Sequence, residues 1–93
     1  MDTKTGLKQI TAAMELVLDK HQEAKGNSWV SCNIQFLEDK LKEEFEEYQK
    51  ERKPLAKAEE LVDLANIAMM LYDRHLEIWA SKTAAFMSKN TEE

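Results

Sequence analysis

The chain has 93 residues, carries a formal net charge of -5 and is 43% hydrophobic. This length is enough for one small domain, which we expect to span residues 1–93. Because the lysines and arginines of this acidic chain form no continuous stripe, the composition argues against nucleic acid as its main partner. The lone Cys32 cannot form an internal disulfide, and neither a signal peptide nor a membrane span is recognisable. We therefore expect a cytoplasmic protein without a membrane partner.

The composition predicts an all-α fold, because two glycines and one proline leave little room for a meander of strands and turns. Apolar residues spaced by three and four predict a first helix over about residues 5–24, and Gly26 is suited to the turn that ends it. A second helix is expected over about residues 32–51. Ser31 is the candidate N-cap of this helix.

The third predicted helix follows Pro54, because proline is tolerated in the first turn of a helix but not in its interior. It is expected over about residues 55–75, and a short or kinked C-terminal helix over 76–88. The segment Leu61–Tyr72 is apolar almost all the way round, which is typical of a helix buried on most sides. So short a chain has few other segments to cover it. We therefore expect a small helical bundle completed by dimerisation or higher oligomerisation.

Two acidic motifs lie on the second and third predicted helices. Helical residues three apart share a face, so Glu44 and Glu47 project in one direction, as do Glu60 and Asp63. Asp63 lies in the apolar segment, where an ionised carboxylate is costly unless it is paired or bound to a metal. Two antiparallel helices would combine the four acids into a metal cage. A buried lysine or arginine beside Asp63 is the alternative.

Four carboxylates without a histidine suit Mg²⁺, with Mn²⁺ as a substitute, better than zinc. A cation held in this way binds phosphate oxygens and lowers the pKa of a bound water, which favours hydrolysis of a phosphoanhydride. Glu43, beside Glu44 on the more open side of the helix, is the candidate general base.

Three further residues are candidates for substrate binding. Trp29, in the loop before the acidic helix, is suited either to stacking on a nucleotide base or to closing the end of the bundle. Lys40, one turn before Glu44, would reach a phosphate oxygen or pair with Glu44. Asn66, one turn after Asp63, would bind the metal or a substrate oxygen, or satisfy Asp63 or a neighbouring helix.

The two motifs together resemble a known family signature. Glu43-Glu44-x-x-Glu47, followed after twelve residues by Glu60-x-x-Asp63, is similar to the EExxE…ExxD pattern of the MazG-like nucleoside triphosphate pyrophosphohydrolases. These enzymes belong to the wider all-α NTP pyrophosphatase superfamily. The gap between the motifs lies at the short end of what the family uses.

The resemblance extends upstream of the acidic helix. The segment Lys25-Gly26-Asn27-Ser28-Trp29 is similar to the Gly/Ser/Trp loop that often precedes the first acidic helix in this family. The similarity covers roughly residues 7–80. It implies cleavage of a nucleoside triphosphate, such as a dNTP or a non-standard NTP, between the α and β phosphates. The products would be a monophosphate and pyrophosphate.

The same resemblance implies how the enzyme would work and what it would serve. It implies that Mg²⁺ is bound by the four matching acids Glu44, Glu47, Glu60 and Asp63. It also implies that the active sites lie near subunit interfaces in a dimer or tetramer, and that the enzyme removes unwanted nucleotides from the pool. The chain is shorter than the two-domain members, so substrate preference does not transfer. Phosphoribosyl-ATP, dUTP and dCTP pyrophosphohydrolases remain alternatives. A non-catalytic helical dimerisation module, in which the acids only provide solubility, is the alternative from another class.

Overall fold

The computed structural model describes the backbone of residues 1–25 and 28–91 and the side chains of residues 1–21 and 28–84. The predicted all-α fold is confirmed, since no strand occurs within these backbone ranges. Three α-helices and one turn of 3₁₀ helix follow each other along the described backbone: α1 (Thr3–Lys25), η1 (Ser28–Val30), α2 (Ile34–Lys50) and α3 (Pro54–Thr91).

The helix starts follow local sequence signals. Asn33 caps α2, because its side-chain Oδ1 accepts a 2.8 Å hydrogen bond from the backbone N–H of Gln35. The predicted cap, Ser31, was therefore wrong, since the turn after η1 continues two residues farther than expected. Pro54 is the first residue of α3, as suits a residue whose N–H would have no partner there. The predicted turn at Gly26 lies outside the described residues.

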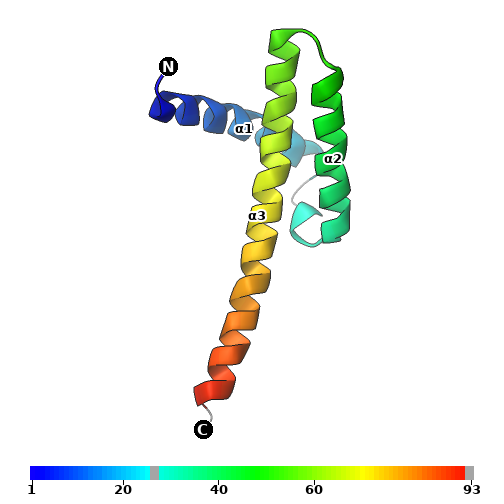
Figure 1. Cartoon of the computed structure of the whole chain (residues 1–93). Coiled ribbons are helices and arrows are strands. Elements are labelled where there is room, and N and C mark those ends of the chain that lie inside the picture. Colours follow the sequence, from blue (N-terminus) through cyan, green and yellow to red (C-terminus); the bar gives the residue numbers. More distant parts are fainter. Residues whose placement is uncertain (26–27, 92–93) are drawn as a thin grey trace.

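The helix α3 runs without a break from Pro54 to Thr91. Residues 76–88 therefore extend the third helix, and the separate short helix that was the other possibility for them is not observed. After Pro54 the sequence has no glycine or proline that would interrupt the helical hydrogen bonds. The second half of α3 projects beyond the other helices (Figure 1), and the molecule is 61 Å long. None of the described helices has an apolar stretch long enough to cross a bilayer.

The helices α2 and α3 lie side by side and antiparallel, and α1 crosses α3 (Figure 1). Leu37 of α2 is the one fully buried apolar side chain among those described. By contrast, Tyr72 and Trp79 on the projecting part of α3 are 68% and 64% exposed, and Leu16 of α1 is 64% exposed. The single chain therefore has a small core and leaves several large apolar side chains in solvent.

Lys57 holds the start of α3 to the end of α2. Its Nζ donates a 2.9 Å hydrogen bond to the backbone carbonyl of Tyr48 and lies 4.2 Å from the centre of the Tyr48 ring. A lysine ammonium in this position gains from both the carbonyl and the ring face. The contact helps to set the register of the two helices, and the register decides which acids of α2 face those of α3.

Candidate metal and substrate site

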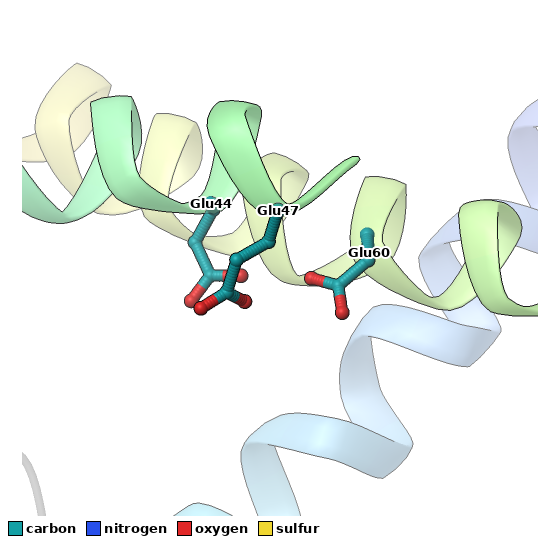
Figure 2. A group of neighbouring side chains, drawn as sticks. All are labelled: Glu44, Glu47 and Glu60. Carbon is teal, nitrogen blue, oxygen red and sulfur yellow. The ribbon is translucent and has the colours of Figure 1, made fainter. Parts of the chain in front are cut away.

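Three glutamates from two helices meet beside the turn between α2 and α3 (Figure 2). Glu44 and Glu47 lie one turn apart on α2, and Glu60 lies near the start of α3. Each offers a carboxylate oxygen, and these oxygens all lie within 4.8 Å of one another. We call these three residues the glutamate cluster. The predicted meeting of the two acidic motifs is thus confirmed for three of the four acids.

The glutamate cluster is partly withdrawn from water. Oε2 of Glu44 and Oε2 of Glu60 are buried and have no hydrogen-bond partner. Burial, followed by the charge of Glu47, raises the pKa of Glu44 to about 7, and burial also raises the pKa of Glu60. Carboxylates that are desolvated and repel one another are stabilised by a proton or a cation between them.

Asp63 lies outside the glutamate cluster but near it. It lines the same cavity as Glu44, and burial raises its pKa, although the nearby His21 opposes this effect. Among the described side chains, no lysine or arginine nitrogen comes within ion-pair distance of Asp63. The described side chains therefore form no ion pair with Asp63, although the charges of His21 and Lys40 both lower its pKa against the effect of burial. A metal-binding role for Asp63 stays a prediction.

Lys40 and Glu43 pair with each other on the solvent side of α2. The Nζ of Lys40 lies 3.9 Å from a carboxylate oxygen of Glu43, and the Glu43 side chain is 57% exposed. The alternative pairing of Lys40 with Glu44 is not observed. Lys40 also lines the cavity, whereas Glu43 is not among the residues of the glutamate cluster. The predicted base thus lies on the open side of the helix, as its sequence position indicated.

A cavity of about 260 Å³ lies beside the glutamate cluster, among α1, η1, α2 and α3. Glu44 and Asp63 line one part of it, and apolar side chains that include Trp29, Leu37 and Met70 line another. A mainly apolar hollow with a few polar groups is the usual setting of a small-molecule site. The predicted substrate-binding residues Trp29, Lys40 and Asn66 all line this cavity.

Asn66 is the buried polar side chain of this cavity, with 4% of its surface exposed. Its Nδ2 donates a 3.3 Å hydrogen bond to the backbone carbonyl of Met14, which joins α3 to α1. Its Oδ1 is buried and has no partner. The predicted contact with a neighbouring helix is therefore confirmed, but it satisfies only one end of the amide.

Arg74, which from the sequence was expected at the surface or at an interface, organises one wall of the cavity. Its Nη1 donates hydrogen bonds of 2.9 Å to the carbonyl of Trp29 and 2.6 Å to the carbonyl of Cys32. These bonds hold η1, and with it Trp29, against α3. No sequence signal could have revealed them, because the acceptors are backbone atoms more than 40 residues away in the chain.

The glutamate cluster fits a hard divalent cation. Its donors are carboxylate oxygens from rigid helices, and Mg²⁺ prefers oxygen ligands. The Oε2 atoms of Glu44 and Glu60 are buried without a donor from the rest of the protein, so a cation would replace the proton that the two carboxylates otherwise share. Histidine and cysteine, which would favour zinc, are not part of the cluster.

Comparisons with known proteins identify no relative: no family model matches the chain, and no curated protein or solved structure shows significant similarity to it. The function must therefore be inferred from the glutamate cluster, the cavity and the residues around them.

Proposed function

We propose that the protein is a Mg²⁺-dependent nucleoside triphosphate pyrophosphohydrolase of the MazG-like type. It cleaves dNTPs or non-standard NTPs between the α and β phosphates and releases a nucleoside monophosphate and pyrophosphate, which removes unwanted nucleotides from the pool. The observation that carries the proposal is the meeting of Glu44, Glu47 and Glu60 beside a cavity with apolar walls. The triphosphate of a nucleotide needs a cation site and its aromatic base needs an apolar surface, and here the two features lie next to each other.

In this proposal Glu44, Glu47 and Glu60 hold Mg²⁺, for which Mn²⁺ can substitute, and Asp63 is the fourth ligand. When bound, the cation neutralises phosphate charge and lowers the pKa of water. The antiparallel packing of α2 and α3 holds the three glutamates on one side of the helix pair (Figure 2). Little further ordering of these side chains is therefore needed on binding.

Lys40 and Glu43 supply the remaining polar functions of the proposed site. Lys40 lines the cavity together with Glu44 and Asp63, which supports the proposal that its ammonium neutralises a phosphate oxygen of the substrate. Glu43 is the proposed general base on the solvent side, where an attacking water has free access.

We also propose that the chain acts as a homodimer or homotetramer. Tyr72, Leu76 and Trp79 are spaced by four and three residues, so they form one stripe along the projecting part of α3. Their side chains are 68%, 44% and 64% exposed in the single chain. A second copy packed along this stripe would cover large apolar surface that a small domain cannot cover by itself.

The proposal is tested by pyrophosphate release. The purified protein is incubated with canonical and modified NTPs and Mg²⁺ or Mn²⁺, and pyrophosphate, phosphate and nucleotide products are quantified. We expect equal amounts of monophosphate and pyrophosphate from at least one substrate. Glu60→Gln should lower kcat/KM by about 100-fold or more, because it removes a charge that acts on the transition state. Glu46→Gln, which alters an exposed glutamate of α2 outside the cluster, is the control.

Two results would count against the proposed reaction. Release of phosphate without pyrophosphate would show cleavage at another phosphoanhydride bond. The absence of pyrophosphate from every substrate with either cation would leave the helical dimerisation module as the better description of the protein.

A further inference from the structure

We propose that the cavity beside the glutamate cluster receives the nitrogen heterocycle of the substrate, and that Asn66 selects a ring edge that presents an N–H donor. The inference rests on the proposed function, because it assumes that the phosphate chain lies at the cluster. It adds the orientation of the substrate and names the protein atom that accepts a hydrogen bond from the ring.

The amide of Asn66 has a defined orientation. Its Nδ2 donates to the carbonyl of Met14, and the reversed amide would place Oδ1 against that carbonyl, so that two acceptors would face each other. The atom left without a partner is therefore the oxygen, which is an acceptor. With only 4% of the residue exposed, bulk water has little access to Asn66. A ligand in the cavity that carries a suitable donor would complete its hydrogen bonding.

The chemistry of this acceptor determines the class of ligand. Phosphate and carboxylate oxygens would be repelled by Oδ1 of Asn66, whereas the amino and imino groups of nucleobases are donors. The apolar side chains of Leu37 and Met70 and the indole of Trp29 line the same cavity and suit the faces of a planar ring. A nitrogen heterocycle satisfies both features, since it has apolar faces and a polar edge.

The arrangement of the acids gives the substrate its direction. Glu44 and Asp63 line the cavity, whereas Glu47 and Glu60 belong to the glutamate cluster but not to the cavity wall. The cavity, at about 260 Å³, has room for a planar ring. The ring would therefore lie in the cavity, and the phosphate chain would extend outward past Glu44 to the rest of the cluster.

The inference is tested by binding of hydrolysis-resistant α,β-methylene triphosphates that carry adenine, guanine, cytosine or uracil, measured calorimetrically with Mg²⁺. Each is compared with a partner whose amino or imino donors are replaced by methylated nitrogen. For the tightest-binding base we expect methylation to weaken binding about 10- to 100-fold, because Oδ1 of Asn66 then stays unpaired. This comparison uses the unaltered protein and does not depend on the folding of any variant.

A variant assigns the effect to Asn66. In Asn66→Ala, methylation of the ligand should weaken its binding by only about 2-fold or less, since no buried acceptor remains to be satisfied. Met69→Leu, which makes a substitution of similar volume on α3 outside the cavity wall, should keep the full loss. A methylation loss of the same size in Asn66→Ala and in the unaltered protein would overturn the assignment, as would equal binding of the methylated and unmethylated ligands.

The controls separate this inference from the proposed function. Imidotriphosphate, which has no base, should bind more weakly than the best nucleotide analogue by at least 10-fold. If it binds equally well while NTPs still yield pyrophosphate, the ring site is wrong and the reaction stands. If the analogues bind with the expected dependence on base and donor but no NTP yields pyrophosphate, the reaction is wrong and the ring site stands.

Discussion

Glu44 and Glu60 come from different helices, yet they present carboxylate oxygens within 4.8 Å of each other, and Oε2 of each is buried without a hydrogen-bond partner. The turn before Pro54 and the antiparallel packing of α2 and α3 create this contact. Two carboxylates in such an arrangement are expensive to ionise together. The free energy of folding should therefore respond to pH and to divalent cations through this pair.

The metal-free protein should lose stability as the pH rises from about 4.5 to about 7. The pKa of Glu44 is raised from 4.5 to about 7 by burial and then by Glu47, so in this range the folded chain retains a proton that the unfolded chain releases. The contribution is therefore complete below pH 4.5 and is lost as the pH passes through 7. Allowing for solvent screening, we expect a loss on the order of 2 kcal/mol.

Urea unfolding in the presence of a chelator at several pH values measures this effect. The informative quantity is the difference between the unaltered protein and Glu44→Gln, because other groups titrate in both. That difference should change over the same pH range. Glu46→Gln, which alters an exposed glutamate of the same helix, should retain the pH dependence of the unaltered protein. If the free energies of unfolding of the unaltered protein and of Glu44→Gln changed with pH in parallel, the raised pKa of Glu44 would not be the cause of the pH dependence.

Mg²⁺ should raise the melting temperature, because it binds the folded cluster and not the unfolded chain. At a concentration 100 times its Kd, the gain is about 2.7 kcal/mol. Glu47→Gln should remove most of this gain, and Glu46→Gln, the neighbouring substitution outside the cluster, should keep it. The gain should also be larger at pH 8 than at pH 6, since Glu44 must release its proton to bind the cation. Thermal denaturation with increasing Mg²⁺ measures each of these effects.

Arg74→Ala should loosen the wall of the cavity that carries Trp29. It removes two charge-assisted hydrogen bonds, to the carbonyls of Trp29 and Cys32, and should lower the free energy of unfolding by about 2 kcal/mol. In the proposed enzyme it should raise KM more than it lowers kcat. Arg52→Ala, an exposed arginine before α3, is the control and should change neither quantity. A stable Arg74→Ala protein with an unchanged KM would show that η1 does not need this arginine.

Trp79→Glu should favour the monomer if the stripe on α3 is an interface. A charge buried between two copies would be unpaired, so we expect the association constant to fall by 100-fold or more, on the order of 3 kcal/mol. Ser81→Glu adds the same charge on the opposite face of the helix and should leave association unchanged. Light scattering over a range of protein concentrations measures the mass. A monomeric unaltered protein at all concentrations would exclude this interface.

Much of the fold could be predicted because helix signals are local. Apolar periodicity, together with the scarcity of glycine and proline, predicted all three long helices, and Pro54 marked the start of the last one. The sequence left open whether a separate helix begins after residue 75, because no glycine or proline marks a boundary there, and α3 continues to Thr91. The cap of α2 was misplaced from Asn33 to Ser31, since both are residue types that favour this position.

The helix faces that carry the acids follow from the sequence alone, because residues three apart on a helix share a face whatever the rest of the chain does. The packing of the helices then places Glu60 in the cluster and Asp63 in the cavity wall, and it leaves Oδ1 of Asn66 without a partner. It also decided that Arg74 holds Trp29. These relations depend on the register and crossing of separate helices, and on backbone acceptors, which side-chain periodicity does not encode.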